Sequence, residues 1–272
     1  MPAAYPRSST VRGGPASGTP HSARVWDYWL GGKDHYAIDR ALGDRILAAI
    51  PRQRDHVRAN REFLVRAVEF LVGEAGIRQI VDIGAGLPTS PNVHEVAQAV
   101  APETRVVYVD NDPVVMAHAR ALMTAQEPGR VAFVPGDLSA PHGILDDVAA
   151  VLDLDQPVAV LILATLMFVD DAAAPCQKVR ELMAPLASGS YLGATHTTAD
   201  LDPSAMAAHV AAAADLGLRV VPRSRAQVLA LFGPELELAP PGLVPVLQWR
   251  PRGIVRPRSH AADLYAGVAR KP

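Results

Sequence analysis

Three aspartates that each follow a short apolar segment are the residues best suited to chemistry. They stand in "IVDIGAG" as Asp82, in "VVYVDND" as Asp110 and in "VPGDLS" as Asp137. An acid about two dozen residues after a glycine loop is well placed to accept hydrogen bonds from two ribose hydroxyls. A third acid beyond the next apolar segment would accept a hydrogen bond from an adenine amino group. Together these residues predict a nucleoside-binding site.

The loop after Asp82 indicates which kind of nucleoside. Gly84, Ala85 and Gly86 allow close backbone approach, but "LPTS" follows where a dinucleotide-binding loop has a third glycine. A diphosphate site needs bare N–H groups along the whole turn and at a helix N-terminus. This bulkier loop beside three carboxylates suits a nucleoside without phosphates, and it tolerates a positively charged sulfonium.

The composition disfavours several classes of protein. The chain of 272 residues is 49% hydrophobic, which requires a sizeable core, and its net charge of -2 gives no general attraction to nucleic acid or an anionic membrane. Cys176 is the only cysteine, so neither an internal disulfide nor a cysteine-based zinc site is available. The longest apolar run, 157–169, is short for a membrane span of about 20 residues, and no signal-peptide core is evident. We expect a cytoplasmic protein with a small-molecule partner, no nucleic-acid or membrane partner and no metal.

Apolar periodicity predicts an α/β fold after Gly76. Short apolar runs alternate with helical patterns, as in βαβ units on a parallel sheet with helices on both faces. Strands are expected near 79–83, 105–109, 130–134, 157–164 and 189–195, with helices near 91–100, 113–125, 143–152, 172–186, 203–215 and 224–232. Ser90 is the expected N-cap of the first of these helices, with Pro91 at its first position. Segments 243–249 and 263–270 are expected to pair as an antiparallel hairpin at the sheet edge, with 250–258 as their loop.

The N-terminal part of the chain has a different character. Residues 1–20 are rich in Pro, Gly, Ser and Thr and predict a flexible tail. Helical spacing then begins near His21, is interrupted at Gly31-Gly32 and stops at Pro51, and a further helix runs to Gly73 or Gly76. We therefore divide the chain into a tail (1–20), an N-terminal helical cap (21–76) and an α/β domain (77–272).

Several segments together resemble one protein family. They are "ARVWDYWLGGKDHYAIDR", "VRANREFL", "DIGAGLPTSPNVHEVAQ", "VVYVDNDPVV" and "SGSYLGATH". This ordered set is similar to the actinobacterial S-adenosyl methyltransferases, formerly a domain of unknown function, within the class I S-adenosylmethionine-dependent methyltransferases. The resemblance covers about residues 21–272 and implies a Rossmann-like, mostly parallel seven-stranded sheet with an N-terminal helical extension. It also implies S-adenosylmethionine as cofactor.

The resemblance and the residue types give a set of candidate site residues. For the cofactor these are Arg58, Asp82, Gly84, Ala85, Gly86, Asp110, Asn111, Asp137, Leu138 and Ala164. For the acceptor they are His35, Tyr36, Met167 and His196, with no assigned catalytic base.

Several of these roles have structural alternatives. Arg58 or Arg61 would hold the methionine carboxylate of the cofactor, and Arg58 is the choice made here. Asp82 would contact the ligand through water or cap nearby backbone, and Asn111 would cover the adenine or support the turn. Trp26, Tyr28, Trp29 and Tyr36 would form an aromatic lid or pack the N-terminal helices, and packing is favoured for the tryptophans. His196 ends the fifth strand, where it would act as a base or bind backbone.

The predicted function is methyl transfer from S-adenosylmethionine to an unidentified small molecule. One alternative is an NAD(P)-dependent oxidoreductase, which the missing third glycine opposes. Another is a regulatory protein that binds S-adenosylmethionine without turnover. That alternative draws on Met167, because related members often carry a histidine at this position.

Overall fold

A computed structural model describes residues 19–123, 129–253 and 262–272. Nearly all of the predicted tail, 1–20, and much of the predicted loop, 250–258, lie outside these residues. Within them, no helix combines the length and apolar character needed to cross a bilayer.

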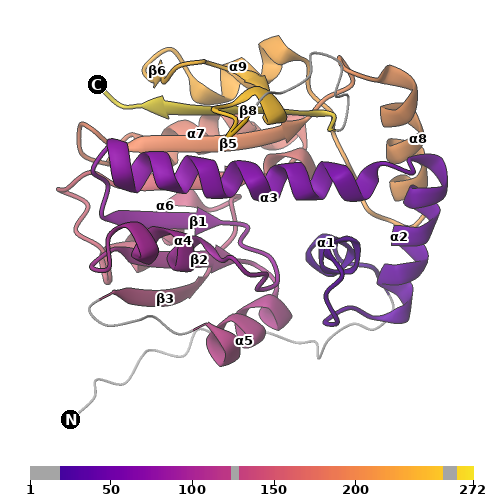
Figure 1. Ribbon diagram of the computed structural model, residues 1–272, viewed down its shortest axis with the longest axis horizontal. Helices are drawn as coiled ribbons and strands as arrows, with labels where there is room; N and C mark the ends of the chain where they lie inside the picture. The colour runs from indigo at the N-terminus through magenta and orange to yellow at the C-terminus, as the bar shows by residue number, and fades with distance from the viewer. Residues whose placement is uncertain (1–18, 124–128, 254–261) are drawn as a thin grey trace.

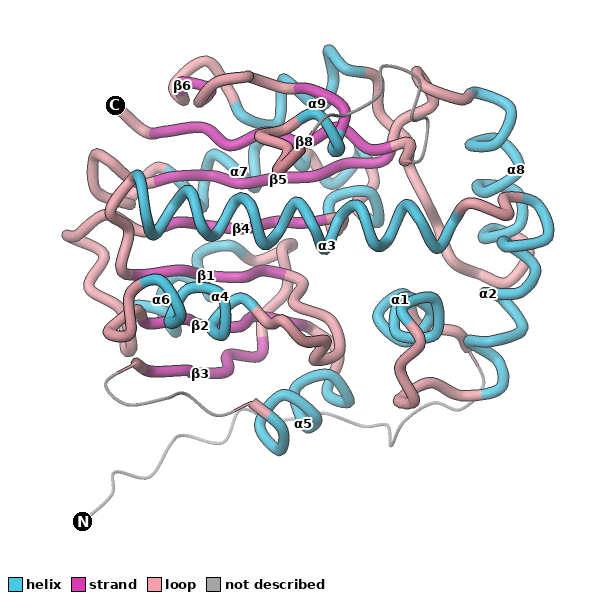
Figure 2. The backbone as a smooth tube through the Cα atoms, viewed as in Figure 1, coloured by secondary structure: helices cyan, strands magenta, loops and turns pink. Residues whose placement is uncertain are grey.

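One twisted sheet organises the molecule (Figure 2). Its parallel strands are β1 (Gln79–Ile83), β2 (Arg105–Asp110), β3 (Arg130–Pro135), β4 (Ala159–Leu163) and β5 (Tyr191–Thr197). The strand order is β3-β2-β1-β4-β5-β8-β6, where β8 (Leu264–Arg270) is antiparallel to β5, and β6 (Glu237–Leu238) and β7 (Val244–Pro245) pair with β8. The predicted fold class is therefore confirmed. The sheet has eight strands and not the expected seven. Its count includes β6 and β7, which are only two residues long.

Helices cover both faces of the sheet, as the doubly wound pattern requires (Figure 1). One face carries α3 (Gln53–Glu69) with its π-helical continuation η1 (Phe70–Glu74), α4 (Val93–Val100) and α5 (Pro113–Leu122). The other carries α6 (Pro141–Ala149), α7 (Pro175–Met183) and α9 (Arg225–Phe232). Central strands β1 and β4 are buried along their whole length, which explains why they read as continuous apolar runs.

Two local predictions are wrong in detail. Helix α4 begins at Val93 and is capped by Asn92, not Ser90, because Asn92 forms a capping box with Glu95 whose carboxylate also accepts the Ser90 hydroxyl. In segment 243–249 only β7 pairs with β8. The residues after it form the 3₁₀ turn η4 (Val246–Gln248), so the hairpin is much shorter than expected.

A third layer lies beyond the carboxyl ends of the parallel strands (Figure 1). It consists of α1 (Ser22–Leu30), α2 (Ala37–Ala49) and α8 (Pro203–Ala214), whose core includes Val25, Trp29, Leu42, Ile46 and Ala213. We call this layer the cap. It differs from the predicted cap, 21–76, because α3 packs on the sheet and α8 comes from much later in the chain. The division of the chain into domains stays a prediction.

Arg66 ties α3 to the segment that precedes β8. Its Nε donates to the carbonyl of Trp249 at 2.9 Å, and its Nη2 donates to the carbonyl of Val246 at 2.8 Å. The indole of Trp249 is fully buried and packs edge-to-face on Phe63 and Phe70. The guanidinium therefore satisfies two backbone acceptors that have no access to water.

We predict that Arg66→Met lowers the free energy of unfolding by roughly 2–4 kcal/mol, because two buried carbonyls lose charged donors. The control is Arg58→Met in the same helix, where the side chain is exposed and pairs only with Asp55. This control should cost less than about 0.5 kcal/mol. Denaturant unfolding measures both variants, and equal losses would show that the two buried bonds do not stabilise the fold.

Candidate functional site

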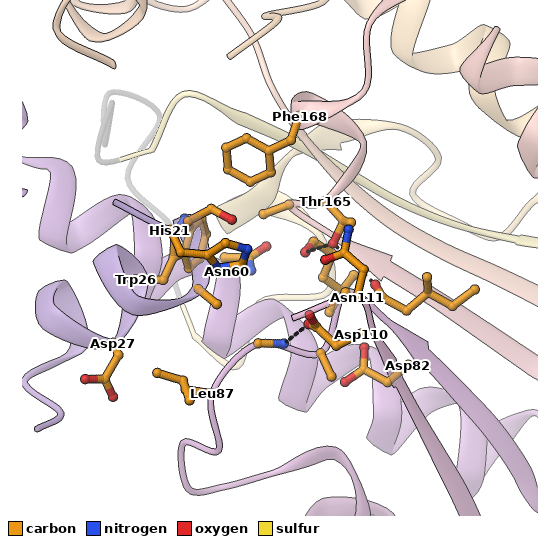
Figure 3. Close-up of a pocket in the computed structure, with 18 of the residues that line it drawn as sticks. His21, Trp26, Asp27, Asn60, Asp82, Leu87, Asp110, Asn111, Thr165 and Phe168 are labelled. Carbon is orange, nitrogen blue, oxygen red and sulfur yellow. Dashed lines mark hydrogen bonds between the residues drawn. The ribbon is translucent and has the colours of Figure 1, made fainter. Parts of the chain in front are cut away.

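A cavity of about 400 Å³ opens at the carboxyl ends of β1 to β4, between the sheet and the cap (Figure 3). Its size falls in the range of small-ligand sites. Most of the sequence-predicted cofactor residues line it: Asp82, Gly84, Ala85, Gly86, Asp110, Asn111, Asp137, Leu138 and Ala164. Among the described residues, no group of three or more His, Cys, Asp or Glu side chains could hold a metal ion.

Asp110 connects the glycine loop to the start of α5. Its Oδ2 accepts the N–H of Gly86 and its Oδ1 accepts the N–H of Asp112, both at 2.9 Å. Burial raises the pKa of Asp110, and these two hydrogen bonds oppose the shift. A carboxylate offers about four acceptor positions, so two remain for ligand hydroxyls.

Asn111 and Asp137 meet at the ends of β2 and β3. The Asn111 amide donates to Oδ2 of Asp137 at 2.7 Å, and the Ser139 N–H donates to Oδ1 at 2.7 Å. Partial burial alone would raise the pKa of Asp137, but the hydrogen bonds from Ser139 and Asn111 outweigh it and hold the pKa below its ordinary value. Asp137 is therefore ionised and can accept a further hydrogen bond.

The backbone at the ends of β1 and β4 is tightly constrained. Gly84 has φ +73°, and a Cβ there would lie 2.3 Å from Oγ1 of Thr165. Ala164 has φ 53°, and its N–H donates to Oγ1 of Thr195 at 2.9 Å. Thr195 in turn donates to Asn60 of α3 at 2.6 Å. Only glycine fits at position 84, so the first glycine of the loop has a steric reason beyond a simple turn.

Asp82 and Arg61 form the charged floor of the pocket. The pKa of Asp82 is raised to about 7, mainly by burial. Arg61 acts to lower this pKa, and Asp110 acts to raise it. Burial also lowers the pKa of Arg61, whose guanidinium donates to the carbonyls of Thr89 and Pro91. Arg61 is the only arginine or lysine among the residues lining the pocket.

An ion-pair network joins the cap to this edge of the sheet. Arg24 of α1 donates to Asp39 of α2 at 2.9 Å and lies 3.4 Å from Asp112, the N-cap of α5, and all three side chains are buried. His21, at the start of α1, places Nδ1 3.1 Å from Oδ2 of the same Asp112. The cap therefore closes over the pocket through contacts to Asp112, which is close to Asp110 in the chain.

Arg58, the residue expected to hold the cofactor carboxylate, does not line the pocket. Its side chain is 63% exposed and pairs with Asp55, whereas Arg61 and Asn60 line the pocket. The apolar stripe of α3 passes through Val57 and Leu64, and positions 60 and 61 fall on that stripe. This signal was present in the sequence.

None of the four predicted acceptor residues lines the pocket. His196 is fully buried, accepts from Arg223 at 2.7 Å through Nε2, and donates to the Thr197 carbonyl through Nδ1; burial lowers its pKa to about 4. Met167 is also buried. His35 pairs with Asp27, which lines the pocket, and Tyr36 is 42% exposed beneath the Arg24 guanidinium.

Other residues lining the pocket escaped the sequence analysis as site residues. They include His21, Asn60, Thr165 and Phe168, together with Trp26, for which packing was favoured. Trp29 does pack in the cap core, as expected, while Trp26 is half-buried and faces the cavity. The positions of His21 and Trp26 depend on how the cap docks, which no local pattern specifies.

Comparison with known proteins decides the family. Residues 15–272 match the family described as S-adenosyl methyltransferase. The chain belongs to the S-adenosyl methyltransferase family. The predicted family, its enzymatic class and its cofactor, S-adenosylmethionine, are thereby confirmed. Among the curated proteins, none matches the chain.

Solved structures agree with this assignment. A DUF574 family protein from Streptomyces avermitilis is 43% identical, with a TM-score of 0.88, and the match covers 93% of this chain and 98% of that one. A Thermobifida fusca protein named as a "putative methyltransferase" is 37% identical, also with a TM-score of 0.88, over 96% of this chain and 99% of that one. Human N-acetylserotonin methyltransferase, solved with S-adenosylmethionine, is 14% identical over 93% of this chain and 63% of its own. Its TM-score of 0.51 shows a shared fold alone.

The residues of the pocket fit a sulfonium nucleoside. Glycine backbone stands where a side chain would clash, Asp110 keeps acceptor positions beside the Gly86 loop, and Asp82, whose pKa is raised to about 7, can ionise beside a cation. A diphosphate would meet these carboxylates with a single arginine that already binds two carbonyls.

We predict that Gly84→Ala damages both stability and binding, and that Gly76→Ala separates the causes. Gly76 has φ +74° with nothing within 4 Å of a new Cβ. The fall in unfolding free energy of Gly76→Ala therefore measures the cost of the left-handed backbone alone, about 1–2 kcal/mol. Gly84→Ala should cost roughly 1–3 kcal/mol more, because Thr165 must move, and should weaken S-adenosylhomocysteine binding. Denaturant unfolding and calorimetry measure these effects. Equal behaviour of the two variants would refute the role of Thr165.

Proposed function

We propose that this protein transfers the methyl group of S-adenosylmethionine to a small-molecule acceptor. The observation that supports this most is Asp110, which accepts one N–H from the glycine loop and one from Asp112 and keeps acceptor positions for a ribose. When bound, the cofactor supplies a methyl group already activated by a sulfonium. The protein has to orient the acceptor and exclude water, which can supply much of the rate.

Each strand end has a role in this proposal. Asp110 accepts the ribose hydroxyls, and Asp137 with Leu138 holds the adenine, beside Asn111. Asp82 faces the cationic methionyl part of the cofactor. Arg61, whose bonds to the carbonyls of Thr89 and Pro91 both come from Nη2, offers its other N–H groups to the single carboxylate of the cofactor. The cavity between sheet and cap has the size of a small-ligand site, which supports a small acceptor.

The alternatives lose support from the same pocket. A nicotinamide cofactor carries a diphosphate, and the cavity offers it carboxylates and one engaged arginine. Regulation without turnover was motivated by Met167, whose buried side chain is not among the residues lining the cavity. A cytoplasmic location remains part of the proposal, supported by the single cysteine.

Calorimetry tests the proposal directly. We expect S-adenosylmethionine to bind in the micromolar range and NADH not to bind. Asp110→Ala should weaken the binding by about 1–3 kcal/mol, because the ribose loses its acceptor. The control, Asp146→Ala on the exposed side of α6, should leave affinity unchanged. Absence of heat with S-adenosylmethionine, or tighter binding of NADH, would reject the proposal.

Cofactor binding should also release a proton from Asp82. Because its pKa is raised to about 7, the free protein holds much of Asp82 protonated below neutral pH, and a cationic ligand favours the ionised form. Affinity should therefore rise with pH through this range. Calorimetry in buffers of different ionisation heat should show proton release at about pH 6 and little at about pH 8. Asp82→Asn should abolish the release; a buffer-independent heat in the unchanged protein would contradict the assignment.

A further inference from the structure

The part of the pocket formed by the cap is apolar and aromatic. Trp26 and Leu30 of α1, Phe168 of η2 (Leu166–Phe168) and Leu218 after α8 line the cavity and pack against the cap core. Each of these side chains is only half-buried. Figure 3 shows Trp26 and Phe168 on the far side of the cavity from Asp82. Apolar groups left partly open to water in a cavity gain free energy when an apolar ligand covers them.

The carboxylate on this side of the cavity is already hydrogen-bonded. Asp27 lines the pocket, but its Oδ2 contacts Nδ1 of His35 at 2.9 Å and accepts the N–H of Asp34 at 2.9 Å. The side chain of Asp27 is 4% exposed. A cationic acceptor would therefore lose its hydration here without gaining an open partner.

We propose that the acceptor is a flat, neutral aromatic hydroxyl compound, a phenol or enol, which binds between Trp26 and Phe168 and gives its proton to His21. This inference rests on the proposed function, since it requires the methyl donor at the strand ends.

His21 is the one imidazole among the described residues that line the cavity. Its Nδ1 is buried beside Oδ2 of Asp112, at 3.1 Å, although the contact does not meet hydrogen-bond geometry. The carboxylate lies where the acid paired with a catalytic histidine lies, next to the ring nitrogen that does not face the substrate. This leaves Nε2 as the nitrogen available to the cavity, and the ring is 35% exposed.

A base is needed for a hydroxyl acceptor and not for a neutral amine. A phenol becomes a good nucleophile only as its proton leaves, and its acidity is close enough to that of imidazole for direct transfer, unlike that of an aliphatic alcohol. In the transfer, an oxygen lone pair forms the bond to the methyl carbon. The sulfur–methyl bond breaks with its electron pair going to sulfur, and the hydroxyl proton passes to Nε2 of His21.

Several ionisable groups surround His21. Asp112, the N-cap of α5, lies 3.1 Å from its ring, and Arg24 of α1 lies beside Asp112. Asp110 of β2 interacts with it electrostatically, and Asp39 of α2 accepts its backbone N–H.

Three nitroaromatic probes test the acceptor class on the full chain saturated with S-adenosylhomocysteine. They are 4-nitrophenol, 4-nitroanisole and 4-nitrobenzylammonium, and all of them quench tryptophan fluorescence. At a pH where free 4-nitrophenol is protonated, the two neutral probes should bind about tenfold more tightly than the cation. Trp26→Phe should remove most of the quenching, because Trp29 and Trp249 are buried.

The visible band of nitrophenolate reports the proton separately. Bound 4-nitrophenol should ionise at a lower pH than the free compound. This shift should disappear in His21→Gln and persist in His142→Gln, an exposed histidine on α6. Persistence of the shift in His21→Gln would overturn the role of His21. So would a His21→Gln variant whose only change is weaker binding of S-adenosylhomocysteine.

The outcomes separate this inference from the proposed function. Binding of S-adenosylhomocysteine with equal affinity for neutral and cationic probes, or with no probe binding, would overturn the acceptor class and leave the cofactor assignment standing. Failure of S-adenosylhomocysteine itself to bind would overturn both.

Discussion

The carboxylate of Asp110 is the interaction on which the pocket depends. It ends β2, accepts an N–H from the loop that follows β1, and accepts another from the residue that caps α5. Three segments are thereby fixed around one side chain. Burial raises the pKa of Asp110, and both backbone donors act to lower it, which favours the charged form. The acid that positions the loop can therefore also accept hydrogen bonds from a ligand. The Val109 carbonyl holds the start of the glycine loop by accepting from Gly84 and Ala85, and Asp110 holds its end at Gly86.

The cap depends on the same corner of the molecule. Arg24 and His21 reach Asp112, and Asp39 receives Arg24 and the N–H groups of His21 and Tyr36. Breaking a buried pair of this kind leaves an uncompensated charge, so the contact strongly specifies how α1 sits over the cavity. The cofactor side and the acceptor side of the pocket are thus built on neighbouring residues of one turn, and occupancy of one side should affect the order of the other.

Local patterns predicted the sheet well because each strand and helix carries its own signal. Pro113 with Asp112 marked the start of α5 correctly, and the acids at the ends of β1, β2 and β3 line one cavity as the parallel topology requires. One error at the site had a local cause. Arg58 and Arg61 are three residues apart on one helix, and the apolar stripe of α3 points to Arg61, a signal that was given too little weight beside the charge that both residues share.

The acceptor side was the least predictable because tertiary docking decides it. His196 lies one residue before the end of β5, and Arg223 donates to its buried ring. The histidine that lines the cavity is instead His21, which precedes the first helix. It contacts Asp112, which is so distant in the sequence that no motif links the two residues. The contribution of α8 to the cap is equally non-local.

A crystal structure of the protein with S-adenosylhomocysteine is the most direct measurement of the central claim. The ribose hydroxyls should lie within hydrogen-bond distance of Asp110, with the adenine beside Asp137 and the sulfur facing the space bounded by Thr165, Trp26 and Phe168. Density for the nucleoside away from Asp110, or a pocket that admits it only after the Gly86 loop has left that carboxylate, would contradict the claim.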